Sequence, residues 1–244
     1  MLHYKHTPLF QQHYLGRWVI DDSKLVYRYA IGRNDFDGLL PALLRGRWHF
    51  VLGIDLGYND PTAFVVCAYN DFDPTLYVLE VFKEAKLDVT DVAIRARAYQ
   101  ARFDFDAMVI DGSNKQAVEE MRRRHGLALV PADKRGKSDF IELMNGEFVK
   151  AQIKLAPKAQ ALSDEYANLV WDERSAKREE HPGCENHLAD AALYAWRHCY
   201  AYLSQKPQEP PKFGTPEWED AEEQALSDRI EEEQRLEQEA ALWH

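Results

Sequence analysis

The spacing of hydrophobic and polar residues divides the middle of the chain into strands and helices. Three runs rich in β-branched and aromatic residues come first, at 47–55, 62–70 and 75–85. The turn signals GYNDP and DFDP separate these runs, which is typical of an antiparallel meander. We therefore expect three neighbouring antiparallel strands in this part of the chain.

Beyond residue 86 the pattern changes to helices that alternate with short strands. Apolar residues recur at helical intervals, and short apolar runs lie between the helical segments. The expected helices are 88–103, 114–126, 137–150, 159–171 and 186–205, and the expected strands are 106–112, 127–132 and 153–156. This order predicts an α/β fold, with a mixed β-sheet flanked by helices on both faces.

The two ends of the chain differ from this middle part. Residues 1–48 mix aromatic and charged residues without a sustained period, so we expect an irregular lead-in segment. Residues 49–204 contain the predicted sheet and its helices. Residues 205–244 begin with a proline-rich linker and continue as a strong helix former, with Pro216 suited to a first helical position. The apolar stripe of this tail is thin, so the predicted helix is either solvated or bound to a partner.

Composition is that of a globular protein. The chain has 244 residues, of which 45% are hydrophobic, enough for one substantial core. No apolar stretch approaches the roughly 20 residues that span a membrane, and the first residues lack the apolar core of a signal peptide. The three cysteines are scattered and offer no disulfide framework. We therefore expect an intracellular protein without a membrane partner.

The formal net charge of -11 is concentrated in the tail. Residues 209–244 carry 12 acidic and 3 basic side chains, which leaves a net charge of only -2 on the other 208 residues. Basic residues cluster there in MRRRHG, ADKRGK and KAQIKLAPK, and solvated helix ends are one interpretation of each cluster. Because phosphate binding depends on such local clusters, the overall acidity does not exclude a nucleic-acid partner.

Three aspartates lie where strands end or a helix begins. Asp55 ends the first predicted strand, Asp111 ends the 106–112 strand, and Asp190 lies in the first turns of the closing helix. Carboxylates at the ends of neighbouring strands can converge, and a helix packed across that edge can bring a third. Such a cluster repels itself unless hard cations such as Mg²⁺ or Mn²⁺ fill it. Two ions about 3.5 to 4 Å apart can cut a phosphodiester, so the trio predicts nuclease chemistry.

Each aspartate also has a purely structural interpretation. Asp55 could form a turn, Asp111 could cap the next helix, and Asp190 could be an exposed acid favoured by the helix dipole. The ordered trio is what favours a metal site. Gly53 and Gly57 then fit as small neighbours that let metal and DNA backbone come close.

Several segments, taken in order, resemble a known family. They are FQQHYLGRWVIDD (10–22), GIDLGYNDPTA (53–63), MVIDGSNK (108–115), ADKRGKSDFIELMNGEF (132–148) and ENHLADAALYAWR (185–197). The set resembles the nuclease domain of the large terminase subunit of tailed bacteriophages, a member of the ribonuclease H-like superfamily. The first segment is similar to the stretch that leads out of the ATPase domain in these proteins.

The resemblance implies a ribonuclease H-like fold and an endonuclease that cuts concatemeric double-stranded DNA by two-metal-ion hydrolysis. It implies that Asp55, Asp111 and Asp190 are the catalytic, metal-binding acids and that two Mg²⁺ or Mn²⁺ ions are the cofactors. A terminase small subunit and a portal protein are the implied partners besides DNA, and the host cell cytoplasm is the implied location. The tail is a candidate for docking to such a partner.

Some terminases carry a second acid directly after the last aspartate, and that position is Ala191 here. A fourth carboxylate is therefore in doubt, with Glu185 or Asp60 as the substitutes to consider. The chain contains no G-x-x-x-x-G-K-[ST] pattern, so we expect it to cut DNA but not to pump it.

Two segments are candidates for contact with DNA. Lys134, Arg135 and Lys137 precede a helix, where basic side chains and the helix N-terminus can hold backbone phosphates. We expect ADKRGK to be a DNA-contact loop. The polar segment 172–185 comes just before the third aspartate, and the resemblance suggests a mobile hairpin beside the cleft.

Other assignments stay open from the sequence. Junction resolvases and transposases use a similar acid trio, whereas actin-like ATPases and sugar kinases need a second glycine-rich phosphate loop. A structural zinc site could use His181, Cys184 and His187, with His198 and Cys199 downstream. A non-catalytic packaging scaffold that acts through its acidic tail is the non-enzymatic alternative.

Overall fold

The computed structural model describes residues 24–41, 46–175 and 178–204, together with parts of 214–230. The 10–22 segment of the expected lead-in, the linker 205–213 and the end of the tail lie outside the described residues. In the tail, the residues described from 216 onward are helical, as predicted. None of the described helices combines the length and the apolar character that crossing a membrane requires.

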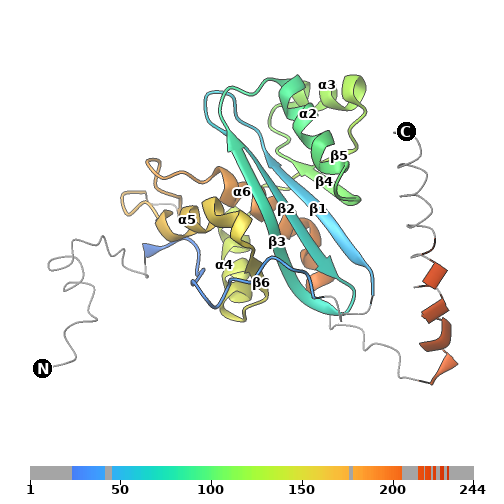
Figure 1. The fold of residues 1–244 in the computed structure, drawn as a ribbon. Coiled ribbons are helices and arrows are strands. Elements are labelled where there is room, and N and C mark those ends of the chain that lie inside the picture. Colours follow the sequence, from blue (N-terminus) through green and yellow to red (C-terminus); the bar gives the residue numbers. More distant parts are fainter. Residues whose placement is uncertain are drawn as a thin grey trace, which may run out of the picture.

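The predicted antiparallel meander forms the middle of a six-stranded sheet (Figure 1). β1 (Trp48–Asp55) pairs with β2 (Thr62–Asn70), and β2 pairs with β3 (Asp73–Glu84), both antiparallel. Short turns connect these strands, so that Asp55 lies opposite Ala63 in the first pair. The meander therefore places the end of β1 next to the turn that leads into β2.

Three short strands extend the meander in parallel, so the sheet is mixed. β4 (Phe105–Ile110) pairs with β1, β5 (Leu129–Pro131) pairs with β4, and β6 (Ile153–Leu155) pairs with β3. The strand order is β5-β4-β1-β2-β3-β6. Because β1 and β4 are parallel neighbours, their carboxyl ends lie at the same edge of the sheet.

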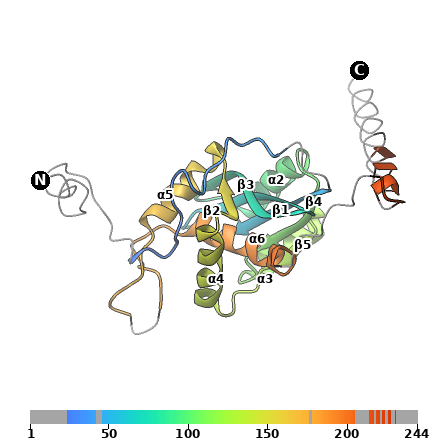
Figure 2. The same cartoon turned by 90° about the horizontal axis from the view of Figure 1, so that it is seen from below.

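Helices cover both faces of the sheet, which confirms the predicted layers. The helices are α2 (Val89–Gln100), α3 (Lys115–His125), α4 (Lys137–Val149), α5 (Gln160–Asn168) and α6 (His187–Leu203), with a 3₁₀ turn at Pro157–Ala159. In Figure 1, α2 and α3 (green) lie on one side of the long strands, and α4 and α5 (yellow) on the other. Figure 2 shows α6 (orange) beside the central strands, with α4 next to it.

The alternation of buried side chains along the strands produces two separate cores. Val51 of β1 packs with residues of α4, α5 and α6. Leu52 and Ile54, which point to the opposite face, pack with residues of α2 and α3. Because both faces of β1 are buried, the strand is apolar throughout and its register is strongly specified.

The described part of the lead-in packs against the first of these cores, although it forms neither helix nor strand of any length. Val26 and Tyr27 are fully buried there, and the ring of Tyr27 lies 4.6 Å from that of Tyr166 on α5. Single β-bridges at Leu25 and Asp35 connect the segment to residues 170 and 155. The irregular character agrees with the sequence pattern, and the division at residue 48 stays a prediction.

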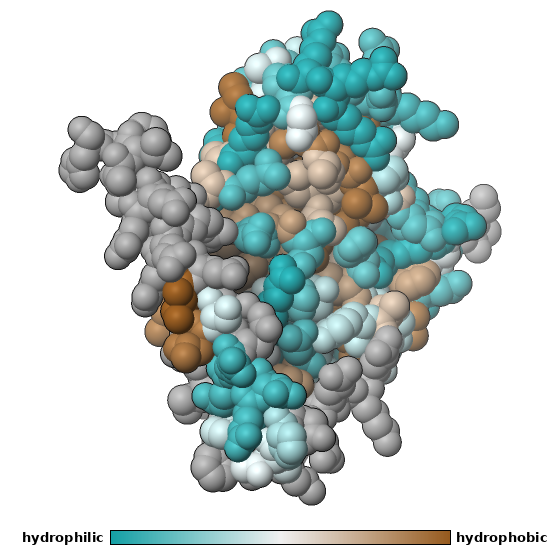
Figure 3. Space-filling view, turned by 90° about the vertical axis from the view of Figure 1, so that its right-hand side faces the viewer, coloured by the Kyte–Doolittle hydropathy of each residue, from teal (hydrophilic) through white to brown (hydrophobic). Residues whose placement is uncertain are grey.

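The exposed hydrophobic side chains are spread over several elements. The most exposed include Ile31, Leu39, Tyr58 and Ile94. The face shown in Figure 3 is mainly hydrophilic, with hydrophobic residues in smaller areas between the polar ones. Single exposed apolar residues of this kind are normal on a protein surface and do not by themselves mark a binding site.

Candidate functional site

Asp55 and Asp111 lie side by side because β1 and β4 are in register. Ile54 is paired with Ile110, and the backbone N–H of Asp111 donates to the carbonyl of Ile54 over 2.9 Å. Asp55 is the last residue of β1, and Asp111 follows the last residue of β4. The structure therefore brings two of the three predicted acids to one edge of the sheet.

The first turns of α6 bring the third acid to the same edge. A Cβ atom on Gly53 would lie 2.0 Å from the carbonyl oxygen of Ala191 and 3.2 Å from the Cβ of Ala195. Only a glycine allows the helix backbone to approach β1 this closely. The expectation that Gly53 leaves room for metal and DNA is wrong, because α6 fills that space. Asp190 precedes Ala191 and is carried to the edge by this contact.

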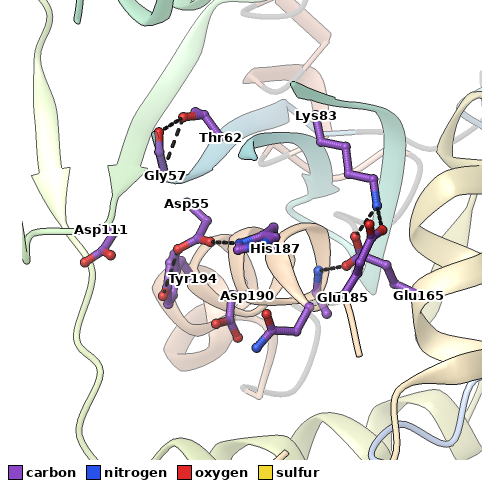
Figure 4. Close-up of polar contacts among 12 residues, drawn as sticks. Asp55, Gly57, Thr62, Lys83, Asp111, Glu165, Glu185, His187, Asp190 and Tyr194 are labelled. Atoms are coloured by element: carbon purple, nitrogen blue, oxygen red, sulfur yellow. Dashed lines mark hydrogen bonds and ion pairs between the residues drawn. The ribbon is translucent and has the colours of Figure 1, made fainter. Parts of the chain in front are cut away.

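A buried ion pair supports the start of α6. Glu165 of α5 accepts a hydrogen bond from the backbone N–H of Ala189 over 2.9 Å, and Lys83 of β3 pairs with the same carboxylate at 2.8 Å (Figure 4). A carboxylate at a helix N-terminus satisfies free N–H groups and favours the helix dipole. Lys83 also binds Glu185 at 2.5 Å, so the Glu185 side chain belongs to this support.

Asp55 faces the side chains of α6. Its two carboxylate oxygens contact His187 Nδ1 at 3.1 Å and the hydroxyl of Tyr194 at 3.3 Å (Figure 4). The side chain is only 10% exposed. The following turn is closed by Thr62, whose hydroxyl donates to the carbonyl of Gly57 over 2.7 Å. The turn-forming interpretation of Asp55 is therefore wrong.

Asp111 is buried and bound on both oxygens. Lys134 pairs with it at 2.8 Å, and the backbone N–H and hydroxyl of Ser113 donate to it, each over 2.8 Å. Burial raises the pKa of Asp111, but Lys134 and Ser113 outweigh burial, so the pKa is lowered. The cap of α3 is Asn114, which accepts from the N–H of Ala117. The helix-capping interpretation of Asp111 is therefore wrong.

Asp190 is buried rather than an exposed first-turn acid. Its side chain is 14% exposed, and its Oδ1 atom lies 2.5 Å from the ammonium group of Lys137, the first residue of α4. Burial raises the pKa of Asp190 to about 7, an effect that Lys137 opposes and nearby Glu180 reinforces. Such a carboxylate is costly without a cation beside it.

Tyr194 shows that the three acids surround one point. Burial raises the pKa of its phenol, and the charges of Asp190, Asp55 and Asp111 raise it further. The close-up in Figure 4 shows the three carboxylates around this side chain at one end of α6. The predicted trio is therefore brought together, from the ends of two parallel strands and the start of a helix.

The comparisons with known proteins give the same picture. No family model matches the chain. The large terminase subunit of Escherichia phage T5 is 27% identical over 165 residues, which cover 62% of this chain and 37% of that protein. The nuclease domain of the phage P22 large terminase superimposes with a TM-score of 0.58 at 12% identity, over 71% of this chain and 92% of that domain.

The chain has the fold of a large-terminase nuclease domain. The nuclease of phage G20c with bound magnesium gives a TM-score of 0.53 at 17% identity, over 71% of this chain and 97% of that one. The large terminase of another thermophilic bacteriophage, in complex with ATP-gamma-S, gives 0.60 at 18% identity, with 77% of this chain but 48% of that protein covered. The predicted resemblance and the ribonuclease H-like sheet are confirmed. The chain spans less than half the length of the whole terminases it matches.

A hairpin lies beside the acids of this terminase nuclease fold. Trp171 and Glu180 form an antiparallel bridge, and the N–H of Asp172 donates to the carbonyl of Glu179 over 2.8 Å. The hairpin and the first turn of α4 line a hollow of about 600 Å³. Glu180 faces inward and accepts from Lys137 at 2.8 Å and from Asn186 at 2.6 Å.

The three predicted DNA-contact residues have different surroundings. Lys134 and Lys137 point into the acid cluster, where they pair with Asp111 and Asp190. Arg135 points outward, with its side chain 91% exposed, and pairs with Asp133. The terminase nuclease fold thus places two internal ammonium groups and one external guanidinium in this loop, and the DNA contact itself stays a prediction.

The residues of the alternative zinc site make separate contacts. His181 accepts from the N–H of Gly183, Cys184 lies near the carbonyl of Asn168, and His187 binds Asp55. In the part of the chain that the structure describes, no three side chains of histidine, cysteine, aspartate or glutamate are close enough to surround one ion. The structure therefore does not support zinc binding by this set.

The same finding defines how the acids fit a divalent cation. Their carboxylates are hard oxygen donors, as Mg²⁺ and Mn²⁺ prefer. In the described chain they are held apart, and ammonium groups occupy the cation positions on Asp111 and Asp190. The donor set and the positive charge beside it fit a metal centre in which Asp55, Asp111 and Asp190 would be the ligands.

Sequence reasoning missed three members of the site. His187 and Tyr194 lie at positions -3 and +4 from Asp190 on α6, so helical spacing alone places them on the same side as that aspartate. Glu180 had no such signal, because it lies in an irregular loop and reaches the site through the hairpin.

Proposed function

We propose that this chain is the nuclease of a phage DNA-packaging terminase and hydrolyses phosphodiester bonds of double-stranded DNA. The observation that carries the proposal is the convergence of Asp55, Asp111 and Asp190 at one edge of the sheet. Three buried acids in one place are unfavourable for stability, so a function that needs their charge accounts for them best. The terminase nuclease fold supplies the reaction class.

Two divalent cations, Mg²⁺ or Mn²⁺, are the proposed cofactors. The G20c terminase nuclease, which shares the fold, has been described with bound magnesium. When bound, such ions activate a water molecule and stabilise the charge on the leaving oxygen of a phosphodiester. The protein holds the carboxylates in place: His187 and Tyr194 orient Asp55, and Ser113 orients Asp111.

The proposed biological substrate is concatemeric viral DNA in the host cell cytoplasm. The sequence similarity to a phage large terminase supports this, since such proteins act in packaging. A small subunit and a portal protein are the proposed partners. We also propose the division into a lead-in (1–48), a nuclease domain (49–204) and an acidic tail (205–244), which the irregular chain before β1 supports.

Dependence of cleavage on divalent ions tests the function. Purified protein is incubated with supercoiled plasmid in Mg²⁺, in Mn²⁺ and in EDTA, and the products are separated on agarose. Nicked and linear DNA are expected with either ion and only intact plasmid in EDTA, because the acids need cations to act on a phosphate. Cleavage that persists in EDTA, or its absence with both ions, would contradict the proposal.

Arg135 is the proposed external phosphate contact of the ADKRGK loop. Replacing it by alanine should weaken DNA binding about threefold to tenfold and reduce the slope of log K against log salt concentration by about 1. Fluorescence anisotropy with a labelled duplex in Ca²⁺ over a series of salt concentrations measures both. Arg123→Ala is the matched control, since Arg123 is exposed and pairs with Glu119 on α3. An unchanged slope for Arg135→Ala would remove this residue from the DNA interface.

A further inference from the structure

A fourth carboxylate, Glu180, shares a cation with Asp190. The ammonium group of Lys137 lies 2.8 Å from Glu180 Oε2 and 2.5 Å from Asp190 Oδ1. We propose that Glu180 is the fourth acid of the site and that Glu180 and Asp190 bind a divalent cation at the position now held by the Lys137 ammonium. This inference rests on the proposed function, because it extends the same metal centre.

The distances suit a metal ion after small side-chain movements. Mg²⁺ binds carboxylate oxygens at about 2.0 to 2.1 Å, so the two N–O distances exceed a metal–oxygen distance by less than about 1 Å. The oxygens of Glu180 and Asp190 already face one point from two elements, the hairpin and α6. The ammonium marks where a cation is held.

Charge balance favours a divalent ion at this point. Glu180 and Asp190 carry two negative charges, and Lys137 supplies one positive charge, so the group is left with a net charge of -1. Its burial is deep, since the side chain of Glu180 is only 10% exposed. A divalent ion in place of the ammonium would make the group neutral, which lowers the cost of keeping it away from water.

One oxygen of Glu180 is still available. Within the described part of the chain, Glu180 Oε1 is buried and accepts no hydrogen bond, and Asp190 Oδ1 is held by its ion pair alone. Buried carboxylate oxygens without donors are rare in proteins and call for a ligand. The hollow beside α4, which Glu180 and Lys137 help to line, gives small ions access from solvent.

The other candidates for a fourth acid are less well placed. Glu185 is bound by Lys83 on the far side of the α6 start, and Asp60 is exposed in the turn after β1. Glu179, the neighbour of Glu180 on the hairpin, is exposed. Glu180 is anchored by its bridge to Trp171 and by the Asn186 amide, which directs its carboxylate inward.

Metal binding without DNA tests the inference. Mn²⁺ affinity is measured by isothermal titration calorimetry for wild type, Glu180→Gln and the control Glu179→Gln, with Asp190→Asn as the reference for loss. We expect Glu180→Gln to weaken the affinity of at least one Mn²⁺ ion tenfold or more, and Glu179→Gln to stay within twofold of wild type. Glu180→Asp, which keeps the charge, should recover part of the loss. Thermal melting of each variant in EDTA checks the fold.

A second measurement needs no variant. Reductive methylation followed by peptide mass spectrometry reports the reactivity of each lysine, with and without Mn²⁺. Labelling of Lys137 should rise at least threefold when Mn²⁺ displaces its ammonium, whereas Lys150, paired with Glu147 on the surface, should not change. Labelling of Lys137 that is unchanged or lower would overturn the inference, whether or not Glu180→Gln folds.

The outcomes separate the inference from the proposed function. If Asp190→Asn loses Mn²⁺ but Glu180→Gln binds it as well as wild type or better, Glu180 only holds Lys137, and the three-acid nuclease stands. If wild type binds no Mn²⁺ at millimolar concentration, both the inference and the metal-dependent function fall.

Discussion

Replacing Asp55 by asparagine is expected to lower the rate of DNA cleavage by about 10³-fold while the protein stays folded. Asparagine preserves the shape of the side chain and still accepts the hydrogen bond from Tyr194, but it removes the negative charge next to Asp111. Loss of one preorganised charge contact at a reacting phosphate costs on the order of 10²- to 10³-fold, and about 10³-fold corresponds to about 4 kcal/mol of transition-state stabilisation. Plasmid cleavage rates in Mn²⁺ measure the effect.

Asp104→Asn is the matched control for this substitution. Asp104 is exposed at the start of β4, whereas Asp111 follows the end of the same strand, so the control removes one charge at the opposite edge of the sheet. Its cleavage rate should stay within twofold of wild type, and both variants should melt within a few degrees of it. If Asp55→Asn cut DNA at the wild-type rate, the acid trio would not be the catalytic centre.

The fold could be predicted from the sequence because its signals are local. The runs 47–55, 62–70 and 75–85 alternate and are separated by turns, and they form β1, β2 and β3 nearly as expected. The helices follow the helical spacing of apolar residues. Errors are confined to the ends of elements: the predicted strand 127–132 shortens to Leu129–Pro131, and the predicted helix 159–171 ends at Asn168. Beyond Asn168 the chain is extended, and Val26 and Trp171 make backbone hydrogen bonds between residues 169–171 and the lead-in.

The position of the acids could also be predicted, but the groups that bind them could not. Strand order alone places Asp55 next to Asp111, because parallel neighbours end at one edge. Lys134 and Lys137, in contrast, carry the composition of a surface loop, and only the packing of α4 beside α6 turns them toward Asp111 and Asp190. A charge pattern does not show which way a lysine points, since its long side chain can reach solvent or a buried acid from the same backbone position.

The contact between Gly53 and α6 shows how closely the fold and the site depend on each other. Replacing Gly53 by alanine should lower the free energy of unfolding by about 3 kcal/mol, since the new Cβ would lie 2.0 Å from the backbone oxygen of Ala191 and the helix would have to move. A loss of this size lowers the melting temperature by roughly 6 to 12 °C in a domain of about 150 to 250 residues. Cleavage should fall about 10²-fold even where the variant is fully folded, because a shift of about 1 Å misplaces Asp190. Differential scanning calorimetry and plasmid cleavage below the melting temperature measure the two effects.

Gly146→Ala provides the opposite result in the same protein. Gly146 lies inside α4, and none of the described atoms would come within 4 Å of an added Cβ, apart from the helix's own backbone and the two chain neighbours. Alanine is the better helix former, so this variant should gain about 0.5 to 1 kcal/mol and cleave DNA at the wild-type rate. If Gly53→Ala were as stable and as active as Gly146→Ala, the approach of α6 to β1 would not be what positions Asp190. A loss of stability without a loss of activity would mean that α6 relaxes by moving its far end and that the support from Glu165 and Lys83 alone keeps its first turn in place.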